Sequence, residues 1–84
     1  MVIIMAAFKR EFKFDNDIRQ KISKNIRKYR LESGITQEQL ALDIGNSYDF
    51  TRRLEFRNGE IGCSIDTLYK ISVVLNTRID KFFE

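Results

Sequence analysis

Apolar side chains recur with a helical period near the start of the chain. Four of them are spaced by four, four and three positions: Ile18, Ile22, Ile26 and Tyr29. This spacing places them on one face of a helix with 3.6 residues per turn. Gly34 follows at a point where a left-handed helix ending is favoured. The pattern therefore predicts a helix from Ile18 to about Ser33.

Two shorter helices are predicted directly afterwards. Thr36 and Gln39 have the spacing of a capping box, in which each side chain binds the other residue's unpaired backbone N–H. The residues expected on the buried side of this second helix are Leu40, Ala41 and Ile44, and Gly45 ends it. A third helix is predicted over residues 47–56. Two short helices with a tight glycine-containing link are typical of a helix-turn-helix motif.

The last part of the chain predicts a fourth helix and a final short turn. Ser64 is the expected N-cap of this helix, because a serine hydroxyl accepts a hydrogen bond from an unpaired N–H of the first turn. The residues expected to face the core are Ile65, Leu68, Ile71, Ser72 and Leu75. A last turn, capped by Thr77 and Asp80, is expected to end in Phe82 and Phe83.

Residues 1–17 fit the helical pattern poorly. Phenylalanines and charged residues alternate between Phe8 and Phe14, which is the period-two pattern of a strand. Since one isolated strand is not stable in water, three interpretations stay open: a flexible tail, a strand that pairs with its copy in a second subunit, and a helical arm. We therefore divide the chain into an N-terminal extension, residues 1–17, and one helix-turn-helix domain, residues 18–84.

Composition favours a small helical protein without enzymatic chemistry. The chain has 84 residues, no proline and four glycines, so little interrupts its helices. We predict an all-α fold, a compact bundle of about five helices. The absence of histidine and the single cysteine, Cys63, remove the usual general base and the usual zinc ligands. We expect no catalytic residue, no metal site and no cofactor. No apolar run is long enough to cross a membrane, and a cytoplasmic location is expected.

Positive charge is concentrated at the start of the chain. The net charge is +3, but residues 1–34 hold nine basic and four acidic groups, whereas residues 35–60 hold three and five. Four of the basic residues form a ridge along the first predicted helix: Lys21, Lys24, Arg27 and Lys28. Such a ridge fits an anionic partner such as nucleic acid, and it equally fits a solvated helix face. We prefer the solvated face for this ridge.

Five short segments occur in a specific order along most of the chain. They are Asn25-Ile26-Arg27-Lys28-Tyr29-Arg30, Gly34-Ile35-Thr36-Gln37-Glu38-Gln39-Leu40-Ala41, Ile44-Gly45, Leu54-Glu55 and Ser64-Ile65-Asp66-Thr67-Leu68-Tyr69-Lys70-Ile71. On these residues, the stretch from Ile22 to Phe83 resembles the lambda-repressor-like, Cro/cI-type (XRE) helix-turn-helix family. The resemblance implies a DNA-binding bundle whose second helix crosses the DNA backbone and whose third helix lies in the major groove.

The resemblance also implies which residues contact the bases. They are the leading residues of the third helix: Ser47, Tyr48, Asp49, Arg52 and Arg53. The helical period agrees with this assignment, because residues 48, 49, 52 and 53 share one face while Thr51 and Leu54 lie on the other. An arginine can donate two hydrogen bonds to a guanine edge. Asp49 either accepts from a cytosine or caps its own helix, and we favour the cap.

Two further sets of residues take their roles from the resemblance. The residues implied to contact DNA phosphates are Gln37, Arg57 and Asn58. Arg30 and Glu55 match a family pair that forms a buried salt bridge between the first and third helices. Because one-sided removal of a buried pair is costly, these two residues are expected to stabilise the fold rather than to contact DNA.

Two functions are compatible with this sequence. The first is a sequence-specific, duplex-DNA-binding transcriptional regulator. We expect it to act as a homodimer on two half-sites, since one small module reads few base pairs, with Phe82, Phe83 and the N-terminal phenylalanines as contact surface. The second is a protein-interaction module on the same fold, antitoxin-like or an adaptor, which the acidic groups of the middle third favour. Neither function calls for a membrane or a small-molecule ligand.

Overall fold

The computed structural model describes residues 16–56 and 61–84, and all regular structure in these ranges is helical. The elements are the α-helices α2 (Asn16–Glu32), α3 (Gln37–Ile44), α4 (Tyr48–Leu54) and α5 (Ile65–Val74), followed by the 3-10 helix η1 (Ile79–Phe83). The predicted all-α bundle is confirmed. The three interpretations of the N-terminal extension concern residues that lie largely outside these ranges, and so do the expected phosphate contacts Arg57 and Asn58.

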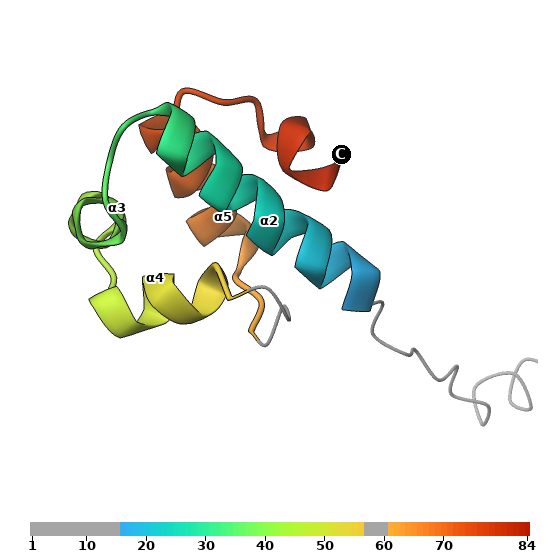
Figure 1. Ribbon diagram of the computed structural model, residues 1–84, viewed down its shortest axis with the longest axis horizontal. Coiled ribbons are helices and arrows are strands. Elements are labelled where there is room, and N and C mark those ends of the chain that lie inside the picture. The colour runs from blue at the N-terminus through green and yellow to red at the C-terminus, as the bar shows by residue number, and fades with distance from the viewer. Residues whose placement is uncertain (1–15, 57–60) are drawn as a thin grey trace, which may run out of the picture.

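The longest helix, α2, packs most extensively against the C-terminal η1, while α3 packs against α4 and α5. Figure 1 shows α5 behind α2, with α3 and α4 on one side of it and η1 on the other. Each of these elements contributes to a single core of buried apolar residues: Ile26, Leu40, Ile44, Leu54, Leu68, Ile71, Leu75 and Phe82. Burying these side chains is the main contribution to stability of a domain this small.

The C-terminal helix η1 packs against the core through one of its two phenylalanines. Phe82 is completely buried, and its ring meets that of Tyr29 edge to face, with 5.7 Å between the ring centroids. The Asn25 amide also donates a hydrogen bond to the Phe82 carbonyl, at 2.9 Å. The expectation that Phe82 lies in a dimer contact is therefore wrong, whereas Phe83 keeps 44% of its surface exposed.

Hydroxyl side chains begin three of the helices. Thr36, Ser47 and Ser64 accept hydrogen bonds from backbone N–H groups three residues further on, at 3.0 to 3.1 Å. The caps expected at Thr36 and Ser64 are confirmed. The cap expected at Asp49 is wrong, because Ser47 stands at the N-cap position and Asp49 lies inside the first turn of α4.

Three other local expectations are also corrected. The Gln39 amide does not reach back to Thr36, because it donates to the Asp43 carboxylate one turn ahead at 2.8 Å. Ile65 is 66% exposed, since it is the first residue of α5 and its side chain lies beyond the edge of the core. No side chain caps η1, whose N-cap is Arg78.

Candidate nucleic-acid interface

The turn between α3 and α4 sets the geometry of the candidate interface. Gly45 ends α3 in the left-handed conformation, with a φ of 73°. An added Cβ would meet no atom within 4 Å there, so the position requires glycine for its backbone conformation and not for space. The next N–H, that of Asn46, donates to the Ala41 carbonyl at 2.9 Å. Ser47 then caps α4, and the two helices follow each other within three residues.

Helix α4 has one buried and one exposed face. Thr51 and Leu54 are buried against the core, at 0% and 1% exposure, and the Thr51 hydroxyl donates to the Ser47 carbonyl at 3.3 Å. The face expected to contact bases is open to solvent, and it carries Ser47, Tyr48, Asp49, Arg52 and Arg53. The structure therefore leaves all five side chains accessible, and residues 48, 49, 52 and 53 share one helical face.

The charged groups of this face are not all equivalent. Arg52 donates to the Asp49 carboxylate at 2.8 Å, in a pair whose side chains are both largely exposed. The Arg53 side chain has no hydrogen bond or ion pair with any residue of the described ranges. No residue of the described ranges therefore occupies the donors of the Arg53 guanidinium, while the charge of Asp49 is partly neutralised within the helix.

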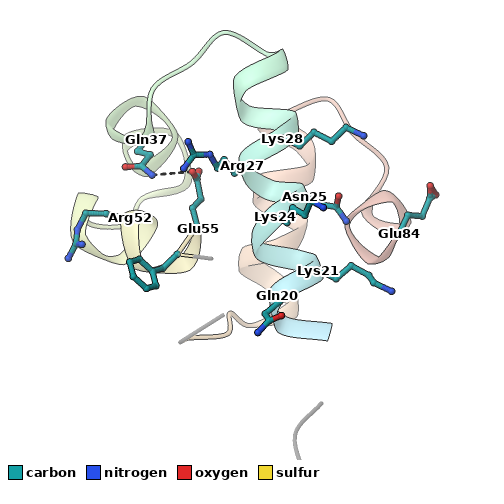
Figure 2. A pocket seen from close by; sticks show the side chains of 11 residues that line it. Gln20, Lys21, Lys24, Asn25, Arg27, Lys28, Gln37, Arg52, Glu55 and Glu84 are labelled. Carbon is teal, nitrogen blue, oxygen red and sulfur yellow. Dashed lines mark hydrogen bonds between the residues drawn. The ribbon is translucent and has the colours of Figure 1, made fainter. Parts of the chain in front are cut away.

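A buried ion pair holds α4 against the rest of the bundle. The Arg30 guanidinium donates twice to the Glu55 carboxylate, at 2.6 and 2.9 Å, and once to the Ile35 carbonyl, at 2.8 Å. Glu55 accepts a third hydrogen bond from the Gln37 amide at 3.1 Å, which Figure 2 shows as a dashed line. This pair, which the resemblance implied, links α2, the start of α3 and the end of α4.

The network also places Gln37 at the edge of the candidate interface. Its side chain is half-buried in the first turn of α3, and the bond to Glu55 uses only one of its two amide hydrogens. The second hydrogen is available to a phosphate oxygen.

The sequence pattern did not indicate a basic cleft that lies between α2 and α4. The cleft is open to solvent and has a volume of about 1100 Å³. It is lined by the basic ridge of α2, by Gln37 at the start of α3, and by Arg52, Glu55 and Phe56 at the end of α4 and just after it. Figure 2 shows Arg27 extending from α2 toward Gln37 and Glu55. Residues 21–28 and 52 are far apart in the sequence, so only the folded arrangement brings them together.

Other groups with possible chemistry show little sign of reactivity. Burial raises the pKa of the Cys63 thiol, which keeps it protonated at neutral pH and fits a packing role. Within the described ranges, no group of three or more histidine, cysteine or acidic residues has the arrangement of a metal site. In the same part of the chain, no helix is both long and apolar enough to cross a membrane.

Comparison with known proteins identifies the class to which this fold belongs. The helix-turn-helix family profile matches residues 26–82, a range that runs from the middle of α2 to the end of η1. The chain belongs to the Cro/cI-type helix-turn-helix family.

One solved structure extends this result at the level of the fold. The chain is similar to the crystal structure of the hypothetical transcription factor NHTF from Neisseria, with a TM-score of 0.72 and 20% sequence identity. The similarity covers 90% of this chain and 83% of that one. The search of curated proteins found no match.

Proposed function

We propose that this protein is a transcriptional regulator that binds duplex DNA in a sequence-specific manner, with α4 in the major groove. The observation that carries the proposal is the open face of α4, where Tyr48 and the two arginines are exposed while the opposite face is anchored in the core. Membership of the helix-turn-helix family supports the same conclusion. The proposal assigns no catalytic step, and it requires access to genomic DNA and hence a cytoplasmic location.

The roles within this interface divide into base and phosphate contacts. We assign base contacts to the exposed face of α4, with Arg53 as the residue best able to bind a guanine edge through two hydrogen bonds. Asp49 acts mainly by holding the Arg52 guanidinium, because its carboxylate already accepts from that residue. Gln37 contacts a phosphate, and Arg57 and Asn58, outside the described ranges, remain proposed phosphate contacts. Residues 18–84 form the DNA-binding domain in this proposal, and residues 1–17 form its extension.

The sharpest test compares two single substitutions. Arg53→Ala is expected to relax the preference at one base pair by about 1–3 kcal/mol, roughly 5- to 150-fold. Gln37→Ala is expected to weaken binding to all duplexes by about the same factor, because a phosphate contact carries no sequence information. Selection from random duplex DNA gives the preferred site, and titrations on that site and on single-base variants give the affinities.

The control for this test is Arg78→Ala, which removes an exposed arginine at the start of η1, on the other side of α2 from α4. It is expected to leave both affinity and preference unchanged. Urea unfolding of every variant is needed, because Gln37 also binds Glu55. If the protein binds no duplex even at low salt, or if Arg53→Ala leaves every preference intact, the proposal is wrong.

We also propose that the regulator is a homodimer. Apolar residues at every fourth position are exposed on one face of α5: Ile65, Tyr69 and Val73, at 66%, 62% and 60% exposure. Aligned exposed apolar groups of this kind are typical of a contact surface rather than of a solvated helix. Because Phe82 is in the core, these three residues and Phe83 are the best candidates for the subunit contact among the described residues.

The dimer proposal predicts a solution mass of twice the 10.0 kDa chain. The double variant Tyr69→Glu/Val73→Glu is expected to shift the protein to the monomer mass, since like charges would face each other across the contact. Leu42→Glu, on α3 and 75% exposed, serves as the matched control and is expected to leave the mass unchanged. Sedimentation equilibrium measures all three. A monomeric native protein would rule out this dimer.

The protein-interaction alternative loses part of its support in the folded chain. The acidic groups that favoured it include Glu55, which is buried and bound to Arg30, and Asp49, which is paired with Arg52. The charge that these two groups show on the surface is therefore smaller than the sequence alone indicates. The DNA titration above separates the two functions.

A further inference from the structure

The basic cleft between α2 and α4 holds more positive charge than the described residues around it balance. Five cationic side chains line it: Lys21, Lys24, Arg27, Lys28 and Arg52. The two carboxylates on its wall, Glu55 and Glu84, are each paired with a cation that is not part of the lining, Arg30 and Lys81 respectively. Arg52 is itself paired with Asp49. Within the described ranges, the positive charge that these three pairs leave unbalanced is therefore that of the α2 ridge.

The ridge on α2 is also electrostatically unfavourable in the absence of a ligand. Lys24 and Lys28 are four residues apart on one helix, and Lys21 and Lys24 are three apart, and like charges at these spacings repel each other. The side chains of Lys21, Lys24 and Arg27 have no hydrogen bond or ion pair within the described ranges. Lys28 makes a contact with the Tyr29 ring, 5.2 Å from its centroid, but has no anionic partner there.

The position of the cleft indicates which anion would enter it. Gln37 and Arg52, two of the proposed DNA contacts, also line its wall. The cleft runs across the exposed surface of α2. Figure 2 shows Arg27 extending toward Gln37 and Glu55, and Lys21 and Lys28 extending from the other side of the helix. A DNA strand that crosses the first turn of α3 would therefore have its neighbouring phosphates near Arg27 and Lys24.

We propose that this cleft is a second phosphate-binding site, which takes backbone phosphates of the same duplex beyond the one bound by Gln37. Lys24 and Arg27 are its central residues. The inference rests on the proposed function, and it extends the interface from the helix-turn-helix onto α2. Since each neutralised phosphate releases condensed counterions, the site would add to affinity and to its salt dependence without adding sequence preference.

The test is a salt titration of duplex binding with Lys24→Gln/Arg27→Gln. Removing two phosphate contacts is expected to make the log–log slope of affinity against salt less steep by about 1.8, at roughly 0.9 per contact. The preference among base pairs is expected to stay as in the native protein. The matched control, Lys70→Gln/Arg78→Gln, removes two charges from residues outside the cleft lining and is expected to leave the slope nearly unchanged.

Two further readouts keep the result specific to the cleft. Ethylation interference is expected to show phosphates that matter to the native protein and not to Lys24→Gln/Arg27→Gln, at positions different from those lost with Gln37→Ala. Urea unfolding is expected to show an unchanged or higher midpoint for the cleft variant, because the substitutions remove like-charge repulsion.

Failure of this site can be told apart from failure of the regulator proposal. If the native protein binds DNA with a preference that Arg53 controls, but the cleft variant and its control have equal slopes, the inference about the cleft is wrong and the regulator proposal stands. If no duplex is bound at all, both are wrong. The last measurement is a titration of the native protein and of Lys24→Gln/Arg27→Gln with sodium tripolyphosphate. Loss of tripolyphosphate binding without a change in the DNA slope would assign the cleft to a free polyphosphate and overturn the inference.

Discussion

Glu55→Ala is expected to lower the free energy of unfolding by about 3–5 kcal/mol, because it leaves the Arg30 guanidinium buried without its anion. Arg30 is only 7% exposed and loses two of its three hydrogen bonds in this variant. Domains of this size gain or lose about 4–8 °C in melting temperature per kcal/mol. The transition should therefore move down by at least roughly 12 °C. Urea unfolding followed by far-UV circular dichroism measures the change.

The control for the buried pair is an exposed one. Arg78 and Asp80 form two hydrogen bonds at 3.0 and 3.1 Å, but more than half of each side chain is exposed. Asp80→Ala should cost less than about 1 kcal/mol, since water screens and replaces such a pair. The double variant Arg30→Met/Glu55→Leu should recover part of the stability, because it leaves no buried charge. A loss below about 1 kcal/mol for Glu55→Ala would mean that the pair does not hold α4 in place.

Phe82→Ala is the second substitution expected to have a large effect. The ring is fully buried at the C-terminal end of the core and meets Tyr29 edge to face. Truncating a buried phenylalanine typically costs about 3–5 kcal/mol through lost burial and the cavity that remains. Part of this is the aromatic contact itself, about 0.5–1.5 kcal/mol. Thermal and urea unfolding should both show the loss.

Phe83→Ala is the matched control, because it removes the same side chain one residue further on, where 44% of the surface is exposed. Its cost should stay below about 1 kcal/mol. Equal losses for the two variants would contradict the placement of η1 against α2. If Phe83→Ala instead lowers the solution mass without lowering stability, Phe83 belongs to the subunit contact.

The sequence predicted best what depends on a few neighbouring residues. The caps at Thr36 and Ser64, the left-handed Gly34 after α2 and the end of α3 at Gly45 follow from local backbone chemistry, and the structure has all of them. The buried side of α3 likewise follows from helical spacing. A second local acceptor explains why one of these predictions failed. Gln39 has the spacing of a capping box, but its amide donates instead to the Asp43 carboxylate one turn ahead, which is a charged acceptor.

What the sequence missed depends on how distant segments meet. Phe82 and Phe83 are adjacent and chemically identical, and only the packing of η1 against α2 decides which ring is buried. Ile65 matches the apolar spacing of α5, yet the core does not extend to the first residue of that helix. The cleft requires residues of α2, the start of α3 and the end of α4 to line one space, and its charge depends on which carboxylates already have partners. No periodicity in the sequence contains that information.

The hydrogen bonds that Glu55 accepts from Arg30 and Gln37 limit how far the helices can move relative to each other. The Glu55 carboxylate joins the last turn of α2 to the start of α3 and the end of α4. Tilting α4 would therefore require breaking hydrogen bonds in a nearly dry site. Helices α3 and α4 should therefore bind DNA as one rigid body. In the proposed complex, a difference in shape between the protein and a DNA site would then be accommodated by the exposed side chains of α4 or by bending of the DNA. The stiffness of DNA varies with its sequence.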